Sequence, residues 1–246
     1  MDNVAFIMYS HSDYSDVWDI FFKQTQRFLP EWKSKYVFVD KEVVKGKPPI
    51  PSEYQVITYD DSLPYQERVA SCLSQIDEDY CVFQHEDHFL YKPADEAQIV
   101  ECLSILQKER TSLDFIKLIK GGEYRDIPKL PYINLYHIPY DSEYVFAIQP
   151  SLWKTKVLTD IYSSCGGETA WSFEVNASQY CRDTQIVGCY IYKGEPQRGA
   201  MHWDSNTYPY IATAIVKGKW NMSEYKSELG MILKRYEVDL GKRGTS

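Results

Sequence analysis

Four consecutive side chains that can bind a metal ion or a proton follow an apolar run over residues 80–83. These side chains are His85, Glu86, Asp87 and His88, and the run before them is typical of a buried strand. Adjacent carboxylates repel each other and lose hydration when buried, so a divalent metal or a basic side chain is expected nearby. Mg²⁺ and Mn²⁺ accept carboxylate ligands and keep several waters, so one or two protein ligands suffice. The alternative interpretation is a solvated loop after a strand.

Polar residues also follow two other predicted strands. Ser10 follows the strand 4–9, and Asp60 and Asp61 follow the strand 54–59. The carboxyl ends of parallel strands meet at one edge of a sheet, where α/β proteins bind ligands. This clustering favours a binding site over a solvated loop.

Three further polar residues are candidates, each with a simpler alternative. Asp60 could accept a hydrogen bond from a base or a ribose hydroxyl, or it could close the turn before Pro64. Arg68 could bind a phosphate in fork geometry, or it could form a surface ion pair. His202, in a predicted loop over 194–204, could add a metal ligand or be solvated.

Glu174 ends the segment Trp171-Ser-Phe-Glu, which places a carboxylate beside two large aromatic side chains. Such surroundings can raise a carboxyl pKa and keep the group near the face of a sugar. The alternative is a helix turn that packs on the core and leaves Glu174 exposed.

The elements that must position these residues alternate along the first half of the chain. This alternation predicts βαβ units around a mostly parallel sheet. The predicted strands are 4–9, 36–39, 54–59, 80–83, 114–119, 132–140, 144–148 and 186–192. The predicted helices are 17–28, 64–76, 94–108, 150–161, 169–181, 208–216 and 222–236. Residues 45–51 are predicted to form a loop and residues 241–246 a disordered tail.

Composition limits the possible partners. The 246 residues carry a net charge of -8, which argues against a broad nucleic-acid-binding surface. Aromatic residues make up 15% of the chain, and Tyr and Trp suit nucleobases and sugars as well as ordinary cores. Common NTPase, dinucleotide-binding, serine hydrolase and zinc protease motifs are absent from the sequence.

The cellular setting is predicted from cysteines and hydropathy. None of the six cysteines forms a C-x-x-C pair, which indicates reduced thiols and a cytoplasmic protein. The first residues, Met1-Asp2-Asn3-Val4, do not resemble a signal peptide, and no apolar run reaches the length of a membrane span. Any membrane contact is therefore expected to be peripheral.

Several segments, taken in order, resemble nucleotide-diphospho-sugar glycosyltransferases of the GT-A fold, especially bacterial and viral surface-glycan enzymes. The matching segments are 64–65 with Arg68, 84–90, 149–153, 170–174, 199–202 and 217–220. The resemblance implies an α/β, Rossmann-type sandwich with a mixed, mostly parallel central sheet flanked by helices. It implies one domain over 1–246, with a nucleotide-binding half (1–92), an acceptor-side half (93–220) and a C-terminal helix and flexible tail (221–246).

The resemblance also assigns the donor site. Residues 86–88 match a D-x-D-like motif that binds the ribose and a Mn²⁺ or Mg²⁺ ion on the diphosphate. His88 stands where that motif often has an acidic metal ligand, which leaves a metal-independent enzyme open. The implied metal ligands are Asp87, His88 and His202. The implied nucleotide-sugar contacts are Tyr9, Ser10, His11, Asp60, Arg68, Glu86 and Asp87.

On the acceptor side, Glu174 matches the acidic residue near the acceptor and is the candidate general base. Trp171 and Asp204 are expected to contact the acceptor. The resulting hypothesis is a glycosyltransferase of glycan biosynthesis that moves a sugar from a nucleotide-diphosphate sugar to an acceptor hydroxyl by single displacement. Both inversion and retention are compatible with the sequence.

Two alternatives stay open. A sugar-phosphate nucleotidyltransferase is less favoured because no Gly-rich loop with Lys or Arg follows the first strand. A non-catalytic glycan- or nucleotide-sugar-binding protein of the same fold stays open because His88 stands in place of an acid.

Overall fold

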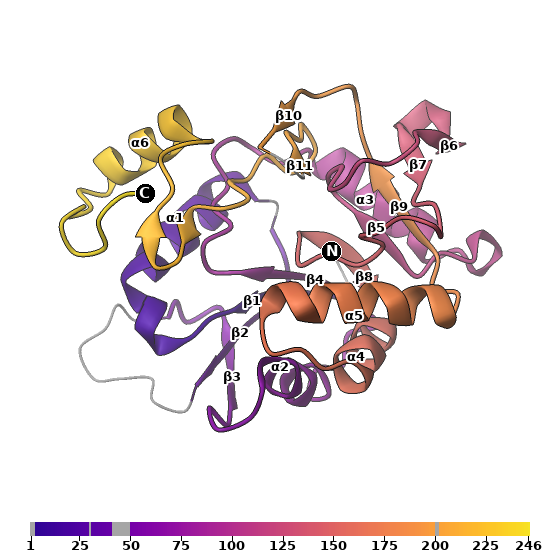
Figure 1. Ribbon diagram of the computed structural model, residues 1–246, viewed down its shortest axis with the longest axis horizontal. Helices are drawn as coiled ribbons and strands as arrows, with labels where there is room; N and C mark the ends of the chain where they lie inside the picture. Colours follow the sequence, from indigo (N-terminus) through magenta and orange to yellow (C-terminus); the bar gives the residue numbers. More distant parts are fainter. Residues whose placement is uncertain (1–2, 30, 41–49, 200–201) are drawn as a thin grey trace.

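A computed structural model describes residues 3–29, 31–40, 50–199 and 202–246, within which a nine-stranded mixed sheet has the order β3-β2-β1-β4-β8-β5-β9-β7-β6. The sheet crosses the molecule with helices on both faces (Figure 1). Its strands are β1 (Val4–Tyr9), β2 (Ser34–Asp40), β3 (Gln55–Tyr59), β4 (Tyr80–His85), β5 (Phe115–Lys117), β6 (Ile127–Leu130), β7 (Leu135–His137), β8 (Ser151–Lys154) and β9 (Gly188–Ile191). The α-helices are α1 (Trp18–Phe28), α2 (Tyr65–Leu73), α3 (Glu96–Leu106), α4 (Thr155–Ser164), α5 (Ala170–Asp183) and α6 (Lys226–Arg235).

Shorter elements complete the described chain. Three 3₁₀ helices are η1 (Ser12–Val17), η2 (Glu109–Thr111) and η3 (Pro131–Ile133). Two small hairpins pair β10 (Gln197–Arg198) with β11 (His202–Trp203) and β12 (Ile215–Val216) with β13 (Lys219–Trp220). Most of the predicted loop 45–51 lies outside the described residues.

The sheet changes character at β4. β1 pairs in parallel with β2 and β4, and β2 pairs in parallel with β3. Beyond β4, β8 is antiparallel to both neighbours, β9 is parallel to β5, and β7 and β6 add antiparallel pairs. The prediction of an α/β fold with a mixed sheet is confirmed. The prediction that the sheet is mostly parallel is wrong, because pairing beyond β4 is mainly antiparallel.

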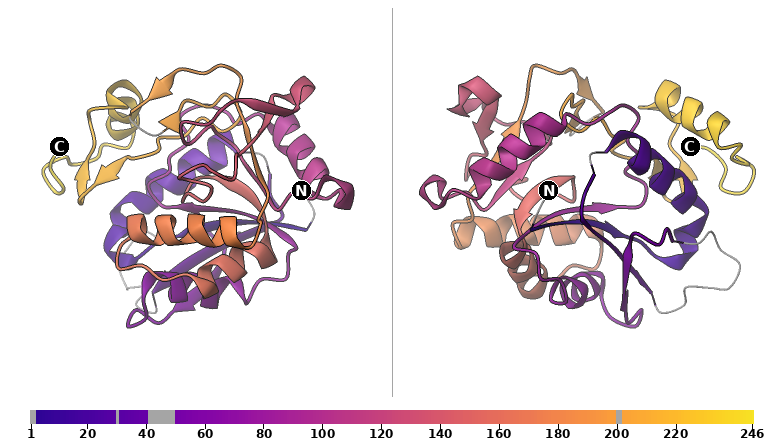
Figure 2. Two further views of the ribbon diagram at one scale, coloured as in Figure 1. Left: turned by 45° about the vertical axis from the view of Figure 1, so that its right-hand side comes forward. Right: turned by 180° about the vertical axis from the view of Figure 1, so that it is seen from behind.

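Each face of the sheet has its own core. In β1, Phe6 and Met8 join the core that includes α1, α3 and α6, whereas Ile7 and Tyr9 join the core that includes α2, α4 and α5. Figures 1 and 2 show these two groups of helices on opposite sides of the sheet. Because the central strands are buried on both faces, they appear in the sequence as continuous apolar runs.

One strand of the central sheet was predicted as helix. Residues 150–161 show helical spacing, yet 151–154 form β8, and α4 begins only at Thr155. Leu152 and Trp153 are adjacent and buried in opposite cores, as a strand inserted between two others requires. A four-residue strand that runs directly into a helix is hidden by the periodicity of the helix.

Residues 144–148 are not a strand, although their composition predicts one. Their backbone groups bond to side chains of α5 instead of to a neighbouring strand. Ser178 Oγ accepts from the Phe146 N–H at 3.1 Å, and Glu174 Oε1 accepts from the Ile148 N–H at 2.6 Å. The segment thereby ties Glu174 to the edge of the sheet.

Residues 208–216 form no helix, and residues 241–246 have a defined conformation. Tyr91 N–H donates to Pro209 O, and Ile211 N–H donates to Phe89 O, so this segment runs beside the chain that leaves β4. At the C-terminus, Trp220 N–H donates to Gly244 O and Ser246 N–H to Trp220 O. Hydrogen bonds distant in sequence therefore order both segments, and both local predictions are wrong.

Residues 3–29, 31–40, 50–199 and 202–246 form helices of at most 14 residues. No helix formed by these residues combines the length and the apolar character needed to cross a bilayer.

Candidate functional site

The carboxyl ends of β1 and β4 lie side by side at the point where the order of the sheet reverses. Tyr9, the last residue of β1, is in register with His85, the last residue of β4. From β1 the chain goes to β2 and β3 on one side, while β4 adds on the other side. Open α/β sheets bind ligands in the crevice outside such a switch point.

Two adjacent carboxylates, the buried Glu86 and the 17% exposed Asp87, occupy the turn that follows β4. Glu86 is 7% exposed, and burial and the adjacent Asp87 raise its pKa well above the ordinary value. Burial raises the pKa of Asp87 to about 6, although its Oδ2 accepts from the Ile215 N–H at 3.3 Å. Among the described residues, Glu86 accepts only from its own backbone N–H. Buried, weakly satisfied carboxylates of this kind fit a bound cation.

Arg243 brings a positive charge to this pair from the C-terminal tail. Its guanidinium pairs with Asp16 in η1 and lies 4.9 Å from the ring centre of Tyr14. Its charge lowers the pKa of Glu86 and of Asp87 without overcoming the effect of burial. Sequence reasoning missed Arg243 because the tail was predicted to be disordered.

The metal-binding role predicted for His88 competes with contacts inside the turn. Its Nδ1 accepts from the His85 N–H at 3.4 Å, and its Nε2 lies 3.9 Å from Asp87 Oδ1. Burial and the neighbouring His85 hold its pKa well below the usual value, which keeps the ring neutral. The ring packs against Tyr210, with centroids 5.2 Å apart.

His202 also does not join Asp87 and His88. Its ring stacks on Tyr225, and its Nε2 lies 3.7 Å from Glu224 Oε2. Over the residues that the structure describes, no three His, Cys, Asp or Glu side chains are placed to hold a metal together. The predicted ligand set Asp87, His88 and His202 is therefore not assembled, and the carboxylates of Glu86 and Asp87 are the groups that fit a cation.

Tyr9 and Ser10 form the floor of the site and are largely covered. Ser10 Oγ accepts from the Trp18 Nε1–H at 2.7 Å, and the Ser10 carbonyl accepts from the Tyr59 hydroxyl at 2.7 Å. Tyr9 stacks on Tyr59 and meets Tyr65 edge-on. These contacts hold the ends of the strands in place. A nucleotide that bonds to Ser10 Oγ, as the sequence predicts for Ser10, competes with the buried hydrogen bond from Trp18.

His11 and Arg68 meet at Asp61, which links the loops after β1 and β3. Asp61 lies 2.6 Å from Arg68 Nη1 and 3.3 Å from His11 Nε2. Arg68 also donates to Leu63 O at 2.6 Å, so its fork is already engaged. Asp60, which was predicted to contact the nucleotide, accepts from the Ser62 N–H and hydroxyl in the turn before α2. Asp61 is thus the acidic residue of this loop that contacts both His11 and Arg68.

Asp40 is a further member of the site that local reasoning did not select. It ends β2, is 4% exposed, and accepts from the Ser12 N–H at 2.6 Å and the Ser12 hydroxyl at 2.8 Å. These bonds help to hold its pKa below the ordinary value despite burial. The sequence offered a signal for this position, because Asp40 ends an apolar run in the same way as Asp60.

Glu174 lies on the other side of the switch point, one turn into α5. The helix begins with a capping box, in which Thr169 and Ser172 exchange side-chain and backbone hydrogen bonds. Burial raises the pKa of Glu174, and the Ile148 N–H and the charge of Lys117 oppose that effect only in part. A carboxylate with a raised pKa that is fixed through one oxygen is suited to accept a proton at the other.

Lys117 is a buried lysine whose charge acts on Glu174. It ends β5, is fully covered, and donates to the Tyr124 hydroxyl at 2.7 Å and to Tyr144 O at 3.1 Å. Burial lowers its pKa to about 7, and the charge of Glu174 limits that shift. A lysine inside the apolar run 114–119 was the sequence signal for this position.

Tyr210 feels the charges of both Asp87 and Glu174. Burial raises its pKa well above the ordinary value, these two charges add to that effect, and its hydroxyl is buried without a hydrogen-bond partner among the described residues. The charge of Glu174 also reaches Tyr65, whose hydroxyl lies 2.8 Å from His85 Nε2. That these acids share one site stays a prediction.

The two predicted acceptor residues differ in their surroundings. Trp171 is 65% exposed, and its Nε1–H donates to the Tyr144 hydroxyl at 3.1 Å beside a cavity of about 410 Å³. Asp204 instead pairs with Arg198 at 3.1 Å, and Arg198 also pairs with Glu228 on α6 at 2.8 Å. Trp171 is thus free to meet a ligand, whereas Asp204 belongs to an ion-pair network.

Comparisons with known proteins do not assign the chain to a family. No family model matches the chain, and no curated protein matches it either.

Proposed function

We propose that this chain is a glycosyltransferase that moves a sugar from a nucleotide-diphosphate sugar to a hydroxyl of a glycan. The observation that carries the proposal is the pair of the buried Glu86 and the largely covered Asp87 at the switch point between β1 and β4. Buried adjacent carboxylates without a full set of partners are costly to the fold. A role in binding a cation, and through it a diphosphate, explains their presence.

On the donor side, the exposed edge of the site offers groups for a nucleotide. Asp61, at the end of β3, is half exposed and can accept from a base or a ribose hydroxyl. Glu86 and Asp87 would hold a Mn²⁺ or Mg²⁺ ion, which supplies positive charge for the departing diphosphate. Arg243 adds a second positive charge on the same side. A negatively charged donor therefore meets local positive charge in an otherwise acidic protein.

On the acceptor side, Glu174 is the base. Its Oε1 accepts from the Ile148 N–H, which fixes the carboxylate and leaves Oε2 for an acceptor hydroxyl. The acceptor oxygen bonds to the anomeric carbon, the bond from that carbon to the diphosphate breaks, and the hydroxyl proton passes to Glu174. The raised pKa of Glu174 makes it a stronger base than an ordinary carboxylate.

An exposed aromatic ridge beside Glu174 suits a sugar acceptor. Trp171 and Tyr144 form the ridge, and Glu123, Tyr124 and Glu143 line the adjoining cavity. Aromatic faces pack on the apolar face of a sugar ring, and carboxylates accept from its hydroxyls. The acceptor would thus lie over the N-terminal part of α5.

Donor binding is tested by thermal unfolding with a panel of sugar nucleotides, each with and without Mn²⁺. A ligand at a hundred times its Kd stabilises the folded chain by about 2.7 kcal/mol, or roughly 5–10 °C in Tm. We expect such a shift for at least one sugar nucleotide and its loss in Asp87→Asn. Asp77→Asn, at an exposed position after α2, is the matched control and should keep the shift. No stabilisation of the wild-type chain by any sugar nucleotide contradicts the proposal.

Transfer is tested with the sugar nucleotide that binds, by following nucleoside diphosphate release in the presence of an oligosaccharide panel. Glu174→Gln should lose turnover by at least a hundredfold and keep donor binding, while the exposed Glu101→Gln keeps both. Unchanged turnover in Glu174→Gln removes it as the base. Donor binding without release for any acceptor would instead identify a non-catalytic binding protein.

A further inference from the structure

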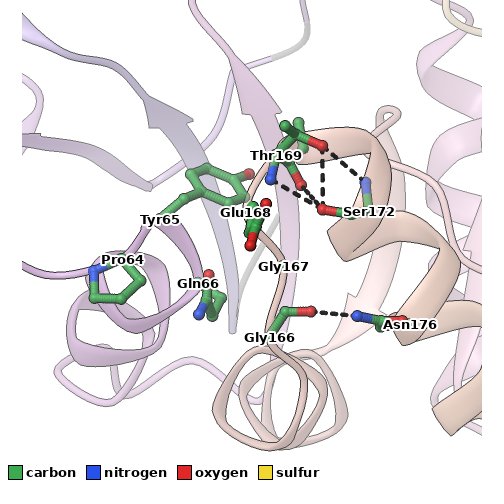
Figure 3. A pocket seen from close by; sticks show the side chains of 10 residues that line it. Pro64, Tyr65, Gln66, Gly166, Gly167, Glu168, Thr169, Ser172 and Asn176 are labelled. Atoms are coloured by element: carbon green, nitrogen blue, oxygen red, sulfur yellow. Dashed lines mark hydrogen bonds between the residues drawn. The ribbon is translucent and has the colours of Figure 1, made fainter.

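A cavity of about 670 Å³ opens between the first turns of α2 and α5, apart from the Glu86–Asp87 pair. Tyr65 and Gln66 line it from α2, Gly166 lines it from the loop after α4, and Thr169, Ser172 and Asn176 line it from the start of α5. Figure 3 shows Gln66 reaching from α2 toward the Gly166–Gly167 loop. The volume lies within the range of small-molecule sites, about 300–1,000 Å³.

The lining indicates an uncharged ligand rich in hydroxyl groups. Apolar surface, including that of Pro64 and Ala170, makes up most of the lining, hydroxyl and amide side chains make up the rest, and the one charged lining side chain is that of Glu168. No Lys or Arg is among these lining residues, so an anionic ligand would face a carboxylate without a compensating cation. Sugar hydroxyls both donate and accept hydrogen bonds and match such a lining.

Among the lining residues, Gln66 has the polar group that a ligand would satisfy. The residue is 9% exposed, and its buried Oε1 has no hydrogen-bond partner among the residues that the structure describes. A buried amide without partners costs about 1–3 kcal/mol, and rotation of the amide would turn its polar atoms toward a bound hydroxyl. The N-terminal end of α2 adds backbone N–H groups, because Pro64 provides no side-chain cap.

The cavity and the base proposed above share the start of α5 but lie on different faces of that helix. Ser172 and Asn176, four residues apart, line the cavity from one face, whereas Glu174, two residues from each, lies on the opposite face. Tyr65 connects the two sides, because it lines the cavity, meets Phe173 of α5 edge-on and hydrogen-bonds to His85 at the end of β4. A glycan that presents one hydroxyl to Glu174 and also enters this cavity must therefore pass around the first turn of α5.

We propose that the cavity between α2 and α5 is a saccharide subsite that binds an uncharged sugar residue of the acceptor, with Gln66 as its specificity-determining contact. The assignment of this sugar to an acceptor rests on the glycosyltransferase function proposed above. The binding of a neutral sugar to the cavity can be measured without any donor.

Filling the cavity is the first test. Gly166 has ordinary backbone angles, and a Cβ added there would meet only Gln66 Nε2 at 3.8 Å, so a larger side chain can project into the space. Gly166→Phe should lose binding to a printed glycan array by at least tenfold, while the matched control Gly166→Ala keeps it. Absence of any binding by the wild-type chain overturns the proposal. Binding that survives Gly166→Phe, or that is confined to sialylated and uronate glycans, overturns it as well.

Removal of the Gln66 amide is the second test. Gln66→Leu should weaken the same glycan binding at least tenfold without lowering Tm, because the buried Oε1 has no partner to lose among the described residues. Gln75→Leu, an exposed position beyond the end of α2, is the control and should bind as the wild type does. Equal binding by Gln66→Leu and the wild type removes Gln66 from the subsite. If no sugar nucleotide binds while Gly166→Phe still abolishes glycan binding, the transferase function fails and the subsite stands.

Discussion

At the scale of single residues, Glu86 and Asp87 show a conflict between stability and binding. Raising the pKa of Asp87 from its ordinary 3.8 to about 6 corresponds to roughly 3 kcal/mol of folding free energy above pH 6. Between pH 3.8 and about 6, the folded chain binds more protons than the unfolded chain. The contribution of Asp87 therefore lowers the free energy of unfolding as the pH rises over this range. A pair that is costly to the fold at neutral pH is expected to serve a ligand.

The Glu86→Gln variant tests this conflict. Without the neighbouring charge, we expect the free chain to gain about 1–2 kcal/mol at pH 7.5, or roughly 2–8 °C in Tm, and to gain much less at pH 4.5. The same variant should lose the Mn²⁺-dependent stabilisation by a sugar nucleotide. Thermal unfolding at the two pH values measures both effects, with the exposed Glu67→Gln as control. A loss of stability at pH 7.5 would show that Glu86 is fully compensated within the protein.

At the scale of elements, Tyr65 links α2 to three other elements, in addition to the apolar contacts of Val69, Cys72 and Leu73. The Tyr65 hydroxyl lies 2.8 Å from His85 Nε2 on β4 and 3.2 Å from the Tyr162 hydroxyl on α4. Its ring also meets Tyr9 and Phe173 edge-on. This one side chain thus joins the floor of the donor site, the helix that follows β8 and the helix that carries Glu174.

Tyr65→Phe keeps the ring and removes the hydroxyl that bridges His85 and Tyr162. We expect a loss of about 1–3 kcal/mol, because two buried polar groups lose a partner, and a Tm lower by roughly 2–10 °C. Tyr80→Phe, at the partly exposed start of β4, should change Tm by less than about 1 °C. Denaturant unfolding of the two variants measures the difference. Equal stability of Tyr65→Phe and the wild type would mean that the hydroxyl bridge contributes nothing to α2 docking.

The same elements show which parts of the fold can be predicted from local sequence patterns. β1, β3, β4 and α5 follow from apolar runs and helical spacing, and these elements carry Glu86, Asp87 and Glu174 near the predicted edge. β8 could not be separated from α4, since its four residues fit the spacing of the helix. Residues 144–148 have the composition of a strand, but their backbone bonds are made by Ser178 and Glu174, which no local pattern encodes.

At the scale of the whole molecule, the site depends on contacts that local patterns do not contain. Tyr210 reaches the site because its segment runs beside the chain leaving β4. Arg243 reaches it because the last residues pair with Trp220 and its guanidinium pairs with Asp16, 227 positions earlier. Such pairings form only when the fold closes, which explains why sequence reasoning selected His88 and His202 and missed these two residues.

Arg243→Gln tests whether this closure serves binding. The pair with Asp16 is partly exposed, so we expect at most about 1 kcal/mol loss of stability. The pKa of Asp87 should rise further, and the affinity for a nucleoside diphosphate should fall about tenfold. Carbon-13 titration of the Asp87 carboxyl and calorimetry measure these effects. Lys242→Gln removes a neighbouring exposed charge and should change neither quantity. If both variants weaken binding equally, Arg243 acts only through net charge. If neither does, it serves only to hold the tail.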